Sequence, residues 1–251
     1  MKKYDLNGVM QRYTDCTNQE PRNTKQSDCS IRTSGNMVVE SIFKNLEERV
    51  IEKIHCADAV VGCVAWLTNE KILEALSNVK EGVSLIVQKE DFLRPDLAAS
   101  NNYKSRLQQK YHKLRSMYGP IDGQFEGKSE AIGEMSDEWW IDKSIRCVGF
   151  AKQKNEITIP RMHHKFLVFC KYLDNFEKYW PYIPYAVWTG SFNMTFNGTQ
   201  SIENAIYIEN EEISESYFNE WNNMLMISEA LDWTSEYAEP DIQFNNLGII
   251  S

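Results

Sequence analysis

The first clear pattern of apolar and polar residues begins near residue 38 and has the spacing of a helix. Residues 38–55 read VVESIFKNLEERVIEKIH, with an apolar side chain every three or four positions, and this predicts an amphipathic helix. The β-branched run AVVGCVAWLT at 59–68 predicts a buried strand. NEKILEALSNVKEG at 69–82 predicts a second helix, with Asn69 as its cap and Gly82 at its end, and VSLIVQ at 83–88 predicts another strand. The order strand, helix, strand indicates a βαβ unit of an α/β domain.

The succession of predicted strands and helices stops at residue 89 and resumes after residue 143. The later segments are predicted to form strands at 144–152, 161–173, 185–192 and 203–210, followed by an amphipathic helix at 211–231. We therefore predict one α/β domain over residues 37–251, with an inserted helix and loop at about 89–143. Residues 1–36 are predicted to form a polar N-terminal extension.

Composition agrees with a packed globular protein, since 42% of the 251 residues are hydrophobic and 12% are aromatic. The N-terminus shows no apolar signal region, and the longest apolar run, 57–67, is interrupted by Asp58 and too short to span a bilayer. The expectation is a cytoplasmic protein without a transmembrane segment. The six cysteines have no CxxC spacing, which favours reduced thiols over disulfides or a zinc site.

Charge is distributed unevenly along the chain. The net charge is −9, but residues 201–251 hold eleven acidic residues and no Lys or Arg, which leaves +2 for residues 1–200. Nucleic acid is therefore not excluded as a ligand, because the acid is concentrated at the C-terminal end.

Two histidines and a lysine precede the apolar part of one predicted strand, RMHHKFLVF at 161–169. Because side chains alternate along a strand, His163 and Lys165 share a face while His164 points to the other. A lysine neutralises phosphate charge, and a histidine attacks phosphorus or transfers a proton near neutral pH. The adjacent histidines diverge, which argues against a metal pair.

Further polar residues follow at the ends of the next two predicted strands. In the stretch TGSFN, Ser191 and Asn193 offer a hydroxyl and an amide to an anion, and Gly190 lets the backbone approach closely. Glu203 opens the next strand, where its carboxylate could accept a hydrogen bond from His163 and fix the tautomer of the ring.

MHHKFLVF, WTGSFNMTFNG and SIENAIYIEN, taken in this order, resemble the phospholipase D superfamily and its HxK, GSxN and EN succession. The resemblance covers roughly residues 40–230 and implies an α/β fold with a phospholipase D-like mixed β-sheet flanked by helices. It also implies that His163 forms a phosphohistidine, that Lys165, Ser191 and Asn193 hold phosphoryl oxygens, and that Glu203 orients His163. No metal or cofactor is implied.

The family draws its general acid from a second motif copy, whereas this chain has one, so the resemblance implies a homodimer with a shared site. The family's usual aspartate is replaced by Cys170. Strand alternation assigns this residue to the face of His164, so we expect its effect to be on local structure.

The resemblance leaves several functions open. Single-motif members of this length look like the dimeric nuclease branch, which implies a metal-independent nuclease acting on DNA or RNA, and an endonuclease is expected. A phospholipid hydrolase or transferase and a catalytically inactive dimeric binding module are the alternatives. Trp139 and Trp140 favour a core or dimer-interface position, and the acidic C-terminal segment favours a solvated surface.

The basic, tyrosine-bearing stretch 101–118 contains no acid. It is either a solvated helix face or a track for a nucleic-acid backbone with base stacking. In the second case the binding residues are Lys104, Arg106, Lys110, Lys113 and Arg115.

Overall fold

The computed structural model of the protein describes residues 29–32, 37–90, 101–117, 143–149, 161–173, 181–231 and 238. Its strands are β1 (Cys29–Arg32), β2 (Val38–Ile42), β3 (Ala59–Val64), β4 (Val83–Gln88), β5 (Ile145–Val148), β6 (Lys165–Tyr172), β7 (Tyr182–Gly190), β8 (Ala205–Glu209) and β9 (Glu229–Ala230). Its helices are α2 (Leu46–His55), α3 (Glu70–Ser77), α4 (Asn101–His112), α5 (Phe196–Gln200) and α6 (Glu211–Met226).

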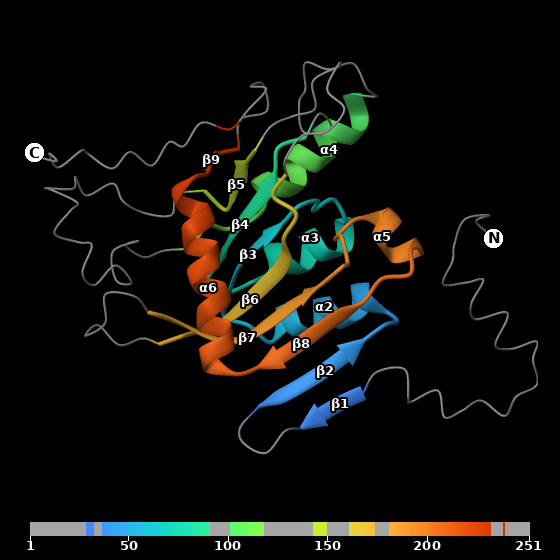
Figure 1. The fold of residues 1–251 in the computed structure, drawn as a ribbon. Helices are drawn as coiled ribbons and strands as arrows, with labels where there is room; N and C mark the ends of the chain where they lie inside the picture. Colours follow the sequence, from blue (N-terminus) through green and yellow to red (C-terminus); the bar gives the residue numbers. More distant parts are fainter. Residues whose placement is uncertain are drawn as a thin grey trace, which may run out of the picture.

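These strands form one mixed sheet in the order β1-β2-β8-β7-β6-β3-β4-β5-β9 (Figure 1). Helices α2, α3 and α4 contribute to a hydrophobic cluster on one face, and α6 packs in a second cluster on the other face. Figure 1 shows α6 in front of the sheet and α2 and α3 behind it. The predicted α/β class, a mixed sheet flanked by helices, is confirmed.

The predicted βαβ unit is present at the centre of the sheet. Strands β3 and β4 are parallel, with Val60 opposite Val83, and all residues of both strands are buried. Asn69 caps α3 by accepting hydrogen bonds from two backbone amides of the first turn. Burial on both faces explains why these strands are continuously apolar in the sequence.

The predicted helix over residues 38–55 is wrong in its first part. Residues 38–42 form β2, which pairs with β1 on one side and β8 on the other, and the helix begins only at Leu46. The spacing of Ile42 from Leu46 imitates a helical repeat across the turn. The β-branched residues Val38 and Val39 gain two neighbouring strands instead, so tertiary pairing determines the structure here.

Both predicted appendages contribute to the domain. Strand β1 lies within the predicted extension and adds to the edge of the sheet. Helix α4 lies within the predicted insertion; it places Leu107 and Tyr111 in the core, and Leu114 joins them just after the helix. The Trp139–Trp140 pair and the chain beyond residue 238 lie outside the described residues. Among the helices described, none has the length and apolar character needed to cross a membrane.

Candidate active site

The predicted site residues come from neighbouring strands at one edge of the sheet. Val64 at the end of β3 lies opposite Lys165, the first residue of β6. Phe166 pairs with Thr189 near the end of β7. Gly190, the next residue, pairs with Ala205 at the start of β8. This register brings the HxK, GSxN and EN segments side by side, although up to forty positions separate them in the sequence.

His163 and Lys165 lie where the chain enters β6. His163 is exposed, whereas Lys165 is only 7% exposed. The Lys165 Nζ donates a hydrogen bond to the backbone oxygen of His163 at 2.8 Å. His164 instead approaches α6, where its Nε2 lies 3.2 Å from the Glu220 carboxylate. The two histidines therefore diverge, as strand alternation predicts.

The segment before β6 is held by polar side chains from the end of β4. Gln88 accepts a hydrogen bond from the backbone amide of Met162 at 2.8 Å. Glu90, only 7% exposed, forms an ion pair with Arg161 and accepts a hydrogen bond from the indole of Trp66 at 3.1 Å. These contacts fix the backbone on which His163 is carried.

Gln88, Glu90 and Trp66 were not among the predicted site residues. The available signal was their position, because all three lie at the carboxyl ends of parallel strands, where α/β proteins bind ligands. Their contact with the β6 entrance depends on β6 lying beside β3, which the sequence alone does not reveal.

Burial and neighbouring charges shift the pKa values of His163 and Lys165. Partial burial and the positive charges of Lys165, Arg161 and His164 lower the pKa of His163 below its usual value. The imidazole is therefore neutral at pH 7 and retains a nucleophilic lone pair. Burial also lowers the pKa of Lys165, while the negative charge of Glu203 opposes this shift. The coupling indicates that Lys165 and Glu203 lie within electrostatic reach.

Ser191 and Glu203 are joined across the gap between β7 and β8. The Ser191 hydroxyl donates a short hydrogen bond to the Glu203 carboxylate and accepts one from the Asn204 amide at 3.0 Å. Close approach of the two chains requires Gly190, because a Cβ atom there would lie 2.2 Å from the backbone oxygen of Asn204. The glycine thus allows the hydroxyl and carboxylate to meet.

Asn193 follows in the same segment. Its Oδ1 is buried and has no hydrogen-bond partner in the described part of the chain. A buried amide oxygen in this state costs free energy that a ligand with a hydrogen-bond donor would recover in part. Asn193 and Glu203 also line a cavity of about 410 Å³ together with Trp66, Thr68 and Tyr103.

The expected hydrogen bond between His163 and Glu203 is not formed between these two described residues. Glu203 is bonded to Ser191 instead. His163 packs against Trp66, with the ring centroids 6.2 Å apart. In this structure the carboxylate therefore acts on Ser191 and Lys165, and the orienting role for His163 stays a prediction.

The predicted nucleic-acid residues on α4 and just after it differ in their exposure. Lys104 is 4% exposed because it lies on the same helical face as Leu107, Tyr111 and Leu114. It cannot track a phosphate backbone from that position, so this prediction is corrected. Arg115 is exposed but donates to the backbone oxygen of Lys80 at 2.7 Å. The other three residues are exposed or half-buried: Arg106, Lys110 and Lys113.

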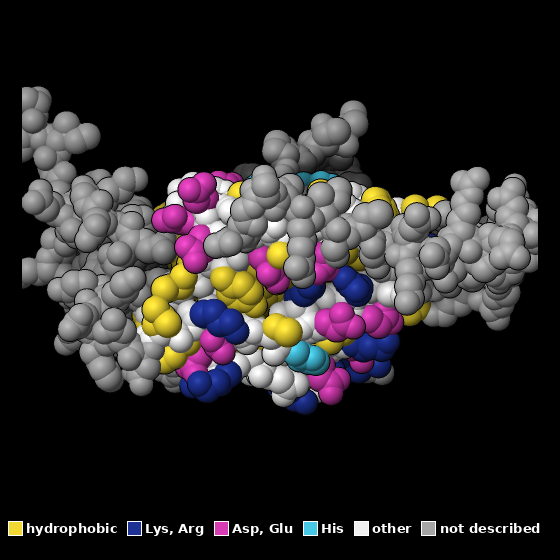
Figure 2. Space-filling model, turned by 90° about the horizontal axis from the view of Figure 1, so that it is seen from below, with side chains coloured by type: hydrophobic (Ala, Val, Ile, Leu, Met, Phe, Trp, Pro, Cys, Tyr) yellow, Lys and Arg dark blue, Asp and Glu magenta, His cyan; other side chains and the backbone are white. Residues whose placement is uncertain are grey.

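The face seen in Figure 2 also offers no broad basic patch among its described residues. Lys and Arg side chains alternate there with Asp, Glu and apolar side chains. A phosphate backbone would need an accumulation of positive charge that this face does not provide.

The cysteines that the structure describes fully are free thiols. Cys63, Cys147 and Cys170 are buried, and Cys56 is exposed. Cys170 belongs to the hydrophobic cluster that packs against α6. Lys165 lies on the other face of β6, because side chains alternate along a strand. This agrees with the expectation that Cys170 does not touch the reacting groups. Within the described ranges, no group of three His, Cys, Asp or Glu side chains is arranged to hold a metal ion.

Several solved structures are similar to this chain. NucT from Helicobacter pylori is 13% identical with a TM-score of 0.45, over 78% of this chain and 99% of that one. Nuc from Salmonella typhimurium, described as a phospholipase D family member, is 17% identical with a TM-score of 0.43, over 79% and 99%. Phosphatidylserine synthase from Haemophilus influenzae is 11% identical with a TM-score of 0.43, over 80% and 41%.

Comparison by sequence gives a closer relationship. No protein-family profile matches the chain. A curated viral protein, uncharacterized protein L381 of Acanthamoeba polyphaga mimivirus, is 34% identical over 205 residues, which cover 78% of this chain and 68% of the viral protein. Identity at this level over most of both sequences shows common descent, and the chain belongs to the same protein family as mimivirus L381.

Proposed function

We propose that this protein is a phosphodiesterase of the phospholipase D type that cleaves DNA or RNA without a metal ion. The observation that carries the proposal is the position of Lys165. Its ammonium donates a hydrogen bond to the backbone oxygen of His163 at 2.8 Å, and the negative charge of Glu203 raises its pKa. One cation therefore links the HxK segment to the EN segment, where a phosphoryl group would be held.

The proposed reaction has two steps. A neutral imidazole nitrogen of His163 attacks phosphorus, a phosphohistidine forms, and the bond from phosphorus to the leaving oxygen breaks. The partner's His163, contributed by a second copy of the chain, gives its proton to that oxygen. Water then attacks the phosphohistidine, loses a proton to the same partner imidazole, and releases a phosphate monoester with both histidines restored.

The remaining residues stabilise charge on the phosphoryl oxygens. Lys165 neutralises the growing negative charge, and Ser191 and Asn193 donate hydrogen bonds. Ser191 currently donates to Glu203, so its hydroxyl must turn toward the substrate when the phosphoryl group enters. Nucleic acid is favoured over phospholipid by the likeness to single-motif dimeric nucleases.

The test is turnover on defined substrates with excess chelator. Purified protein is incubated with single-stranded DNA, duplex DNA, RNA and phospholipid vesicles. We expect nucleic acid to be cleaved and His163→Ala to reduce the rate on the order of a thousandfold or more. The matched control is His112→Ala, which removes an exposed histidine on α4 and should leave the rate unchanged.

Two further measurements test the mechanism. Acid-free quenching followed by mass spectrometry should recover a phosphorylated histidine at position 163, and light scattering should give a dimer. Activity that disappears with chelator, or full activity in a strict monomer, would refute the proposed mechanism. Turnover of phospholipid alone would move the protein to the lipid branch, and a stable dimer without turnover would make it a binding module.

A further inference from the structure

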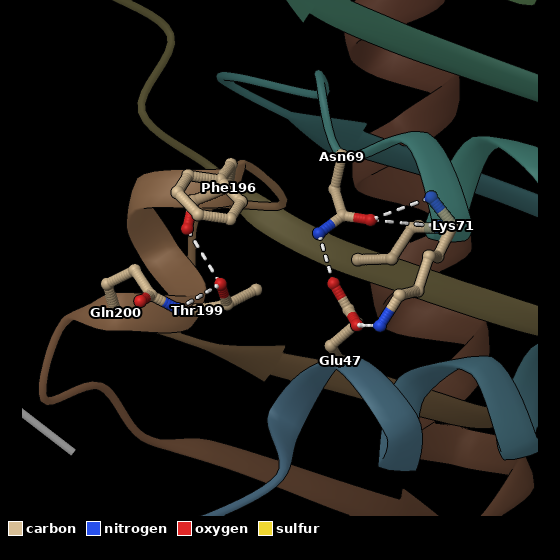
Figure 3. Close-up of polar contacts among 7 residues, drawn as sticks. Glu47, Asn69, Lys71, Phe196, Thr199 and Gln200 are labelled. Carbon is tan, nitrogen blue, oxygen red and sulfur yellow. Dashed lines mark hydrogen bonds and ion pairs between the residues drawn. The ribbon is translucent and has the colours of Figure 1, made fainter. Parts of the chain in front are cut away.

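A groove of about 1050 Å³ lies next to the candidate active site. It runs between α5 and the N-terminal ends of α2 and α3, and Figure 3 shows the side chains that face each other across it. Thr68, Tyr103 and Glu203 line both this groove and the smaller cavity beside Asn193. A ligand whose phosphate lies at the active site can therefore extend into the groove.

Part of the groove lining is apolar and accessible, and it is contributed by several elements. Phe43, Tyr103, Phe196 and Ile202 are 52%, 39%, 51% and 58% exposed. These are four of the seven large apolar side chains that are exposed in the described part of the chain. Apolar surface gathered in this way marks a place where something binds.

A polar network at the starts of α2 and α3 faces α5 across the groove (Figure 3). The Glu47 carboxylate accepts hydrogen bonds from the Asn69 amide at 2.5 Å and from the Lys71 ammonium (Figure 3). The Asn69 side-chain oxygen in turn accepts hydrogen bonds from the backbone amides of Lys71 and Ile72 at 3.0 and 3.1 Å. The network fixes the Glu47 carboxylate and the exposed Lys71 ammonium at the edge of the groove.

Charge and polarity together restrict the occupant. Four carboxylates line the groove against two ammonium groups: Glu47, Glu48, Glu70 and Glu203 against Lys44 and Lys71. A phosphate backbone would be repelled by this excess. An acyl chain would bury the network of Glu47 without replacing the hydrogen bonds that water makes with it. A nucleobase suits this mixed lining, because its faces are apolar and flat while its edges carry donors and acceptors.

We propose that this groove binds an unstacked base of a single-stranded nucleic acid, next to the phosphate that the protein cleaves. The inference rests on the proposed nuclease function and specifies its substrate. Phe196 is the main stacking platform, and Tyr103 lies where the groove meets the active site. Duplex DNA would have to release a base before it could bind in this way.

The test separates bases from backbone and uses binding without turnover. The His163→Ala protein is titrated against a fluorescein-labelled thymidine 12-mer and against an abasic strand of equal length, with anisotropy read at one salt concentration. We expect the base-bearing strand to bind more tightly. Phe196→Ala should weaken that binding about tenfold and change the abasic strand less than about twofold.

Matched variants identify the cause. Phe196→Tyr keeps the ring and should retain affinity, whereas Phe196→Leu keeps apolar volume without the flat ring and should lose most of it. Ile227→Ala removes an equally exposed apolar side chain at the end of α6 and should change nothing. The Leu variant also covers the case in which the alanine variant does not fold.

Several outcomes would overturn the inference. The first is equal affinity for the two strands. The second is that Phe196→Ala dissociates a dimer. The third is that Phe196→Ala weakens binding to phosphatidylcholine vesicles and leaves binding to both strands unchanged. Wild-type protein that cleaves DNA but binds both strands equally would refute the groove and keep the nuclease. Base-dependent binding without any cleavage would refute the nuclease and keep the groove as a binding site.

Discussion

The indole of Trp66 meets the imidazole of His163 edge to face, with ring centroids 6.2 Å apart and planes at 81°. The same indole donates a hydrogen bond to Glu90, which also forms the ion pair with Arg161. Side chains from the ends of β3 and β4 thus hold the segment that carries His163. The reactivity of this histidine therefore depends on residues outside the HxK motif.

Replacing Arg161 with Gln should raise the pKa of His163. The guanidinium disfavours the imidazolium, so its removal makes protonation easier, and the Glu90 carboxylate left behind acts in the same direction. We expect this rise to be visible in an NMR titration of the His163 ring and to be larger at low salt. The control is Lys171→Gln, which removes a cation at the far end of β6. An unchanged titration in the Arg161 variant would show that the ion pair has no influence on the imidazole.

The proposed mechanism predicts a bell-shaped dependence of kcat/KM on pH. The rate rises with pH as one imidazole loses its proton and becomes a nucleophile, and falls as the partner's imidazole loses the proton it must donate. Burial and the neighbouring cations lower the pKa of His163, so the maximum should lie on the acid side of neutrality. Arg161→Gln should move both limbs upward. A profile that rises continuously to pH 9 would contradict a histidine acid.

The central part of the fold follows from the sequence because its residues have few alternatives. The fully apolar runs of β3 and β4 with α3 between them specify a parallel βαβ unit. The pairing of β2 with β8 is different, because the five residues 38–42 satisfy helical and strand patterns equally and only their distant partner decides. Helix α4 carries an apolar pattern among its many charges: Leu107 and Tyr111 lie on one face, Leu114 follows just after the helix, and Lys104 is buried because it lies on that face.

The candidate site also has parts that the sequence predicts and parts that only the folded chain reveals. His163, Lys165, Ser191 and Glu203 were accessible to sequence reasoning because strand-end motifs carry them. The bond from Ser191 to Glu203 was not, because it depends on the close approach of Asn204 to Gly190. Contacts set by strand order and glycine packing need the folded chain.

Lys89 and Glu229 form a buried ion pair whose single mutants should be destabilised strongly. Lys89 is 0% exposed, and its Nζ lies 2.6 Å from the Glu229 carboxylate, which joins β4 to β9. Lys89→Met leaves a buried carboxylate without its cation and should lower the free energy of urea unfolding by ~3–5 kcal/mol. The double variant Lys89→Met, Glu229→Met should recover most of that loss.

The exposed pair between Lys80 and Glu81 provides the control for this comparison. Lys80→Ala should leave the urea midpoint unchanged, because water already screens that pair. Equal effects of Lys80→Ala and Lys89→Met would show that burial does not determine the contribution of the inner pair.

Cys170→Asp, which introduces the aspartate usual in the phospholipase D superfamily, should destabilise the protein without increasing its activity. Cys170 is 0% exposed among apolar side chains that pack against α6, and burial raises the pKa of its thiol, so the group stays neutral. A carboxylate there would be buried among these apolar side chains, where its charge is poorly solvated. We expect a loss of ~2–4 kcal/mol in urea unfolding. Cys170→Ala, which removes the thiol but adds no charge, should cost clearly less.

The rate per folded molecule should be the same for the wild type and both Cys170 variants, because the side chain lies on the face away from Lys165. A tenfold gain in the aspartate variant would mean that position 170 influences the phosphoryl site through the sheet. Measuring the rate and the unfolding curve on the same preparations separates these cases, since a structural role alters only the stability and a chemical role alters kcat at full folding.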